Sequence, residues 1–232
     1  MSLTYCFRLN RLLPLTLAFV CGAACGAPAG GGVTLGQPQQ GIATYYDATG
    51  AGNCGYDPSP NDLLVAAIDA PQYAGSASCG ECVDVVGPSG AVRVRIVDKC
   101  PECGVGHLDL SREAFARIAE LQLGRVDITW TVVSCNVTGS IQYHFKDGSS
   151  QYYTAIQIRN HRIPVQKLEW RRDGNWQEIQ RADYNYFVVS NGVGPGAFRL
   201  RVTAVDGQQL EDDIASVLDN ATVSGSGQFQ VR

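Results

Sequence analysis

The sequence has few basic residues for its length and no long apolar run beyond its first 25 residues. Its 18 lysines and arginines are scattered among 22 acids, and the formal net charge is −4. Binding to phosphate backbones requires clustered basic side chains, so we expect no nucleic-acid partner. A membrane-spanning helix requires about 20 consecutive apolar residues, so we also expect no membrane partner once the N-terminal segment is removed.

The N-terminus has the composition of a secretory signal. Arg8 and Arg11 are its only charges, residues 12–20 form a short apolar run, and residues 22–26 are small enough for a cleavage site. The apolar run is too short to span a bilayer. We predict that residues 1–25 are a signal peptide and that the protein is secreted.

A lipid anchor is the alternative interpretation of this segment. Three of the nine cysteines, Cys6, Cys21 and Cys25, lie in or beside the signal. Either of the last two could carry a lipid, but the residues before each fit a lipidation motif poorly. Secretion therefore stays the expectation.

The second half of the chain lacks cysteine, whereas six cysteines lie between residues 54 and 135. An even number in an exported chain usually forms disulfides, which predicts a first domain stabilised by cross-links. A zinc site is the alternative, because the Cys-x-x-Cys pairs that begin at Cys79 and Cys100 have the spacing of a zinc ribbon. Export, and the two further cysteines that need partners, favour disulfides.

Charge also divides the chain into two units. Residues 26–136 contain six basic and twelve acidic residues, whereas residues 137–232 contain ten of each. This asymmetry predicts two domains with different tasks. We place a disordered lead-in at 26–40, a first domain at 41–136, a short linker at 137–140 and a second domain at 141–232.

Periodicity predicts short strands throughout, with one helix. In the first domain, alternating or β-branched segments predict strands at 42–46, 82–86, 91–97 and 127–133. Ser111 can cap a helix over 112–120. In the second domain, strand-like segments at 141–145, 152–159, 165–171, 177–179, 186–189, 198–205 and 227–231 are separated by Asp-Gly turns. This pattern is typical of an immunoglobulin-like β sandwich.

Two acids stand out in the segment from residue 98 to residue 111. Asp98 closes an apolar strand, and Asp109 follows a glycine-rich turn, so both can project from one end of a small barrel. Such an acid among apolar groups would have a raised pKa and could donate a hydrogen bond. The structural alternative is that Asp109 and Ser111 cap the helix and Asp98 merely ends a strand.

Three segments together resemble the expansins, secreted two-domain proteins that loosen plant cell walls without measurable hydrolysis. They are Gly41-Ile42-Ala43-Thr44-Tyr45-Tyr46, the segment 98–111 with its His107-Leu108-Asp109-Leu110-Ser111 motif, and the segment 149–161 around Tyr152-Tyr153. The resemblance implies a mainly β protein: a six-stranded double-psi β-barrel domain followed by an immunoglobulin-like β-sandwich domain. It further implies the disulfides Cys54–Cys79 and Cys82–Cys135, which leaves Cys100 to pair with Cys103.

The resemblance also implies where the wall-loosening site lies. Asp109 matches the residue on which loosening depends, and the matches to Thr44 and Asp98 lie beside it. Some bacterial members carry a tyrosine two places after the first acid, a position that is Cys100 here. The expected partners are cellulose and matrix glucans, with peptidoglycan as a further candidate; the resemblance implies no cofactor and no metal, and we expect a monomer.

Three different functions also fit these residues. Endoglucanases on the same barrel carry a base after an early Tyr-aromatic pair, and Tyr45-Tyr46-Asp47 resembles that segment, so Asp47 and Tyr46 are further candidate site residues. A turn aspartate explains Asp47 equally well. The second function is that of a lytic enzyme acting on peptidoglycan with one catalytic acid, and the third is that of a pure carbohydrate-binding protein.

The second domain carries a candidate carbohydrate-binding surface. The resemblance assigns it to Tyr152, Tyr153 and Tyr184, with Lys146 nearby, at positions where relatives have a linear aromatic platform. Flat rings suit the faces of pyranose sugars. Adjacent strand residues face opposite sides, so both neighbouring tyrosines can join one surface only at a bulge or at the start of a strand.

Overall fold

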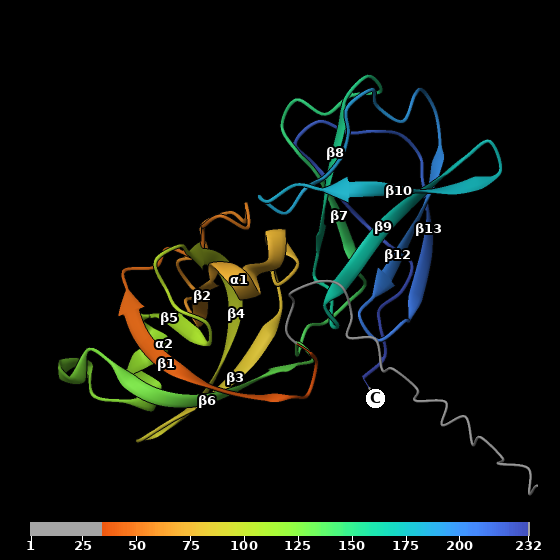
Figure 1. Ribbon diagram of the computed structural model, residues 1–232. Coiled ribbons are helices and arrows are strands. Elements are labelled where there is room, and N and C mark those ends of the chain that lie inside the picture. The colour runs from red at the N-terminus through yellow and green to blue at the C-terminus, as the bar shows by residue number, and fades with distance from the viewer. Residues whose placement is uncertain (1–33, 232) are drawn as a thin grey trace, which may run out of the picture.

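Two β-structured domains follow one another along residues 34–231, the part of the chain that the computed structural model describes (Figure 1). The predicted signal peptide, with Cys21 and Cys25, and most of the predicted lead-in lie outside these residues. Within residues 34–231, no helix combines the length and the apolar character needed to cross a membrane. We call the first unit the barrel domain and the second the sandwich domain.

The barrel domain is closed by six strands: β1 (Pro38–Tyr46), β2 (Val65–Asp69), β3 (Cys82–Gly87), β4 (Gly90–Cys100), β5 (His107–Ser111) and β6 (Val126–Val133). Around the barrel they run in the order β1-β5-β2-β4-β3-β6, with β1–β5 and β2–β4 parallel and the other neighbours antiparallel. The connections include α1 (Ala70–Tyr73), η1 (Ala74–Ser76), α2 (Arg112–Ile118) and η2 (Leu121–Leu123). The predicted six-stranded barrel is confirmed.

Alternation along each strand fills the barrel. In β6 the even-numbered residues from Val126 to Val132 are buried, while the odd-numbered ones are partly or fully exposed. Trp130 is fully buried, and its Nε1–H donates to the carbonyl of Gly106 at 3.0 Å. The same carbonyl passes so close to Gly41 that a Cβ there would lie 1.8 Å from it, so only glycine fits.

The barrel differs from the prediction in strands β1, β2 and β5 and in helix α2. Strand β1 begins at Pro38, inside the predicted lead-in, because residues 38–43 pair with β6. Strands β2 and β5 were not predicted, since β2 is buried at all five positions and β5 was interpreted as a turn before a helix cap. Helix α2 ends at Ile118, two residues before the predicted end, because Ala119 is extended.

The sandwich domain is an antiparallel sheet of eight strands: β7 (Gln142–Phe145), β8 (Thr154–Arg159), β9 (Val165–Arg172), β10 (Asn175–Arg181), β11 (Phe187–Val189), β12 (Phe198–Ala204), β13 (Gln209–Ile214) and β14 (Thr222–Ser224). Their order is β13-β12-β9-β10-β11-β8-β7-β14. Tyr143 and Ile156 from one half share a buried cluster with Leu168 and Leu200 from the other half. The sheet therefore curls into the predicted sandwich, with its halves joined by the β10–β11 pair.

The C-terminal part of the sandwich differs from the prediction. Residues 227–231 form no strand, although Phe229 is fully buried in the core. The N–H of Gln230 donates to the side chain of Gln208 at 2.8 Å, which replaces a backbone ladder. Strands β13 and β14 were not predicted. They are the two end strands of the sheet, and their largely polar sequences give no hydrophobic pattern typical of a strand.

The three disulfides join Cys54 to Cys79, Cys82 to Cys135 and Cys100 to Cys103. This pairing is the one that the resemblance implies. It splits the first Cys-x-x-Cys pair between two different partners, Cys54 and Cys135. The zinc-ribbon alternative is therefore wrong, because the thiolates that it requires are joined in disulfides with other partners.

The segment predicted as a linker, residues 137–140, is held by side chains of the sandwich domain. Asn160 Nδ2 donates to the carbonyls of Thr138 and Ser140, both at 2.8 Å. Arg162 donates to the carbonyl of Val137 at 3.2 Å. With its carbonyls bound in this way, the segment has little freedom, which limits movement of one domain against the other.

Candidate functional site

Four strands of the barrel place the predicted site residues in one row. In the strand register, Thr44 of β1 lies opposite Asp109 of β5, Asp109 lies opposite Ala67 of β2, and Ala67 lies opposite Asp98 of β4. The residues on either side of Asp109, Leu108 and Leu110, belong to the barrel core. Because side chains alternate along a strand, the row faces away from that core. We call Thr44, Asp98 and Asp109 the barrel site.

A bulge turns Asp98 toward this row. The register between β2 and β4 pairs Ala66 with Ile96 but Ala67 with Asp98, so Val97 is an extra residue. Ala66 and Ile96 both lie in the core, and without the extra residue Asp98 would share their face. The carbonyl of Val97 accepts from the N–H of Cys54 at 3.1 Å, which anchors the bulge to the preceding loop.

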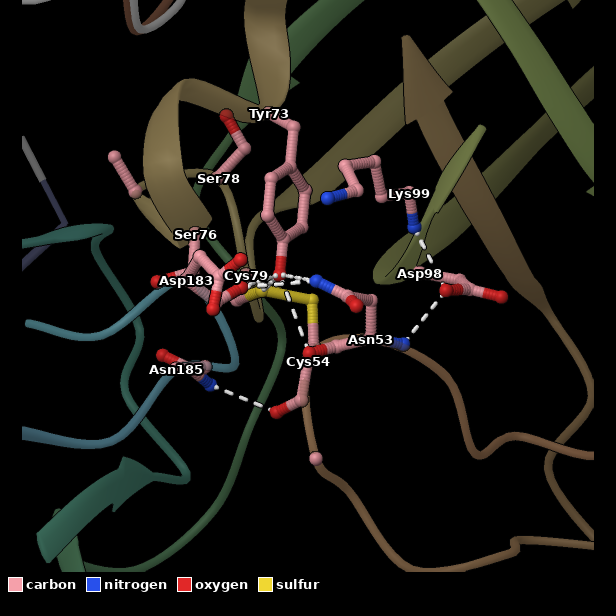
Figure 2. The surroundings of a disulfide bond; sticks show 12 residues. Asn53, Cys54, Tyr73, Ser76, Ser78, Cys79, Asp98, Lys99, Asp183 and Asn185 are labelled. Carbon is pink, nitrogen blue, oxygen red and sulfur yellow. Dashed lines mark hydrogen bonds between the residues drawn. A yellow bond between two sulfur atoms is a disulfide. The ribbon is translucent and has the colours of Figure 1, made fainter. Parts of the chain in front are cut away.

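Backbone donors hold the Asp98 carboxylate in place. Its Oδ1 accepts from the N–H of Asn53 at 2.6 Å and from the N–H of Lys99 at 2.8 Å (Figure 2). Gly52 lies so close that a Cβ there would be 2.4 Å from the Asp98 Cγ. The loop that carries Asn53 therefore needs glycine at position 52 to approach the carboxylate.

Asp109 belongs to a chain of three hydrogen-bonded side chains. Thr44 Oγ1 donates to Asp109 Oδ1 at 2.5 Å, and His107 Nε2 lies 2.9 Å from the same hydroxyl oxygen. A hydroxyl has one proton, and Thr44 uses it for Asp109, so His107 must donate through Nε2–H. The second carboxyl oxygen, Oδ2, makes no hydrogen bond within residues 34–231 and is free to carry a proton.

Burial sets the electrostatics of this group. Burial raises the pKa of Asp109, and the negative charges of Glu102 and Asp98 raise it further, whereas the hydrogen bond from Thr44 and the neighbouring His107 oppose the rise. Burial lowers the pKa of His107, which favours its neutral form. The site therefore holds a carboxyl group that keeps its proton to a higher pH than an exposed aspartate.

Asp109 is not the cap of helix α2. The Oγ of Ser111 accepts from the N–H of Ala114 at 3.0 Å and donates to the carbonyl of Leu63. Ser111 thus caps the helix alone. The structural alternative for Asp109 is wrong, because its side chain is bound to Thr44 instead.

The two further candidates in the barrel differ in their surroundings. Asp47 is exposed just after β1, and no hydrogen bond joins it to Thr44, Asp98 or Asp109 in the described part of the chain. Tyr46, the last residue of β1, packs against Ala67 beside the barrel site. Of the two, only Tyr46 is in contact with the row.

The neighbouring tyrosines of the sandwich domain lie at the start of a strand, as the predicted surface requires. Ser150 and Tyr153 exchange backbone hydrogen bonds of 2.6 and 3.2 Å, which makes residues 150–153 a tight turn before β8 begins at Thr154. Tyr152, at the tip of this turn, has 75% of its surface exposed. The turn, rather than regular strand alternation, sets the directions of the two rings.

Tyr184 follows a residue that contacts the barrel domain. Its ring lies 5.8 Å from that of Tyr186. The carbonyl of the preceding residue, Asp183, accepts from Tyr73 Oη at 2.6 Å and from Asn53 Nδ2 at 2.9 Å (Figure 2). We call Tyr152, Tyr153 and Tyr184 the aromatic surface.

The same junction surrounds the disulfide drawn in Figure 2. The carbonyl of Cys54 accepts from Gln157 Nε2 at 2.8 Å and from Asn185 Nδ2 at 3.2 Å. Asn185 has a left-handed backbone with φ of 65°, a conformation that asparagine tolerates. The Cys54–Cys79 disulfide ties the loop that carries Asn53 to the rest of the barrel domain, and these two hydrogen bonds hold the loop against the sandwich domain.

Sequence reasoning missed the residues that connect the two regions. Asn53 and Asp183 are 130 positions apart; Asn53 belongs to no recognised motif, and Asp183 stands in the Asp183-Tyr184-Asn185 segment but was assigned no role. His107 stands in the recognised segment, but only the structure shows that it orients Thr44. Lys146, in contrast, was predicted near the tyrosines. Its backbone N–H donates to the carbonyl of Ala155 at 3.0 Å, on the hairpin of β7 and β8 that also carries Tyr152 and Tyr153.

Comparison with known proteins defines the wider class. A family model described as lytic transglycolase, built on the double-psi barrel, matches residues 65–130. An expansin of Clavibacter michiganensis superposes with a TM-score of 0.78 at 30% identity, over 84% of this chain and all of that chain. A variant of the Clavibacter protein with one aspartate replaced by asparagine, solved in complex with cellohexaose, superposes with a TM-score of 0.78 at 29% identity and with the same coverage. Fold and site therefore define a double-psi barrel joined to a β sandwich, with carboxylates on the first and exposed phenols on the second.

The relatives also identify the family. The expansin YoaJ of Bacillus subtilis is 38% identical over 191 residues, which cover 79% of this chain and 81% of the relative. The chain belongs to the expansin family.

Proposed function

We propose that this protein is secreted, binds cellulose and related wall glucans through the aromatic surface, and loosens their contacts at the barrel site without cleaving them. The cellohexaose complex of the Clavibacter relative supports a glucan ligand. The disulfides support export, because such bonds persist in oxidising compartments.

At the barrel site, Asp109 is the acting group. Its free Oδ2 can carry a proton and donate it in a hydrogen bond to a glucan hydroxyl or ring oxygen, while Thr44 holds Oδ1. A bond made in this way replaces one between neighbouring glucan chains. No covalent bond has to break, so polymers under tension can creep.

The observation that carries the proposal is the short hydrogen-bonded path between the two regions. Asp98 binds the N–H of Asn53, and the Asn53 side chain binds the carbonyl of Asp183, next to Tyr184. One polymer strand that lies on the phenols is thereby brought beside the carboxyl groups. Separate sites on freely moving domains would not give this continuity.

The test measures creep and sugar release in the same experiment. Heat-inactivated wall strips under constant load are treated with the purified protein, and the medium is analysed for reducing ends. We expect extension without reducing ends. Asp109→Ala removes the hydrogen-bond donor at Oδ2 and should reduce extension at least tenfold, with cellulose binding unchanged within twofold.

Two further variants separate this function from glycan cleavage. Asp62→Ala makes the same change at an exposed loop position and should behave as the unmodified protein. Reducing ends that disappear in Asp47→Asn would instead support an endoglucanase, and anhydromuropeptides released from peptidoglycan would support a lytic enzyme. Full creep in Asp109→Ala would contradict the proposal.

A further inference from the structure

Tyr46 occupies an unusual position beside the barrel site. In the register of β1 and β5, Thr44 pairs with Asp109 and Tyr46 pairs with Ser111. Tyr45, between them, turns to the core, where its ring lies 4.9 Å from that of Phe115. Alternation therefore places Tyr46 on the same face as Thr44.

The ring of Tyr46 has a defined support. It packs against Ala67 and against the Cys100–Cys103 disulfide. Ala67 is the residue that separates Asp109 from Asp98 in the row of the barrel site. A small side chain at this place leaves room for the ring that packs on it.

The hydroxyl of Tyr46 is buried and has no hydrogen-bond partner within residues 34–231. Leaving a buried hydroxyl unpaired is unfavourable, so the packed ring is the part of Tyr46 that acts on the site. Burial, and then the charges of Asp98 and Asp109, raise the pKa of Tyr46. The phenol therefore stays protonated and within electrostatic range of both acids.

We propose that Tyr46, supported by the Cys100–Cys103 disulfide, is a positioning residue that covers the barrel site and shields Asp109 from water. This inference deepens the proposed function and rests on it. The charged or titratable groups that act on Asp109 are His107 on its own strand, Asp98 on β4, and Glu102 in the loop that the disulfide closes. Asp98 and Asp109 are those that act on Tyr46.

The shielding has a consequence for pH. A carboxyl group protected from water keeps its proton to higher pH, which extends the range over which Asp109 can donate a hydrogen bond. Without the ring, water reaches Asp109 and its pKa returns toward the value of an exposed aspartate. Creep activity would then be lost at a lower pH.

The test measures the pKa of the Asp109 carboxyl by carbon NMR titration, together with the pH profile of creep. In Tyr46→Thr we expect the Asp109 pKa to fall by about one unit, and the upper limit of the creep profile to fall with it. Tyr46→Phe keeps the ring and should retain both values. Tyr45→Phe changes the neighbouring phenol, which points to the core, and serves as the matched control.

A second variant guards against a failure to fold. Replacing both Cys100 and Cys103 by serine removes the support of the ring and should lower the Asp109 pKa in the same direction by a smaller amount. An unchanged Asp109 pKa in folded Tyr46→Thr would overturn the inference. Since the titration does not depend on creep, a protein that fails to loosen walls would contradict the proposed function and leave this test intact.

Discussion

The barrel site and the aromatic surface present opposite solutions to the binding of a polar polymer. The barrel site is partly buried, and its carboxyl groups are held by Thr44 and by backbone N–H groups. The aromatic surface is exposed, with Tyr152 at the tip of a turn. The first arrangement sets the pKa of one carboxyl group, that of Asp109. The second provides apolar area for stacking, which does not depend on a pKa.

The difference extends to how each domain is stabilised. The three disulfides all lie in the barrel domain, and two of them, Cys54–Cys79 and Cys100–Cys103, fix loops next to residues of the site. The sandwich domain has no cysteine and relies on a core drawn from both halves of its sheet. Loops that must hold carboxyl groups at a set distance need cross-links, whereas a surface of rings tolerates small movements.

The largest expected effect concerns the junction on which this comparison depends. Glu81 is buried beside Arg181, and burial raises its pKa from 4.5 to about 8. The folded state thus holds the proton more tightly than the unfolded state. The stability that this contributes is present below pH 4.5 and is lost as pH rises toward 8.

Glu81→Gln should remove this loss. One pKa unit corresponds to about 1.4 kcal/mol. Between pH 4.5 and pH 7 the unmodified protein should therefore lose about 3 kcal/mol of its free energy of unfolding that the variant keeps. Urea unfolding at a series of pH values measures the difference. The control is Glu178→Gln, a change at an exposed position. If the free energy of unfolding depended on pH in the same way in both variants, Glu81 would not be buried as described.

A smaller effect tests the aromatic surface. Replacing Tyr152, Tyr153 and Tyr184 by alanine should weaken binding to crystalline cellulose by roughly 10-fold to 150-fold, because each ring contributes about 0.5–1 kcal/mol of stacking. Sedimentation with cellulose measures the loss. Trp176→Ala, on β10 and under the guanidinium of Arg201, should bind as before. Unchanged binding in the triple variant would remove the contrast between the two regions.

The smallest effect concerns the path that connects them. Asn53→Ala removes the side-chain bonds to Asp183 and Tyr73 but keeps the N–H that holds Asp98. We expect creep to fall about fivefold, which corresponds to about 1 kcal/mol, the net contribution of one hydrogen bond, while cellulose binding is unchanged. Asn175→Ala, at the exposed start of β10, is the control. A variant that loses binding and creep together would show that the two regions do not act separately.

Much of the fold could be predicted because its signals are local. Alternating residues in β6 and the Asp-Gly turns of the sandwich domain need only neighbouring residues to be understood. Strand β5 was missed although its residues alternate, because glycines before it and Ser111 after it indicated a turn and a cap. Strand β2 was missed because a strand buried at every position has no alternation.

The sequence by itself indicated the division into two domains and the six cysteines that form disulfides. Through the resemblance, it also indicated Thr44, Asp98 and Asp109 as candidate site residues. Only the tertiary structure decided that an extra residue, Val97, turns Asp98 toward Asp109, and that Asn53 meets Asp183. Local patterns depend on residues a few positions apart, which the order of the chain displays. A contact across 130 positions depends on how two folded surfaces meet, and no short stretch of the chain encodes that meeting.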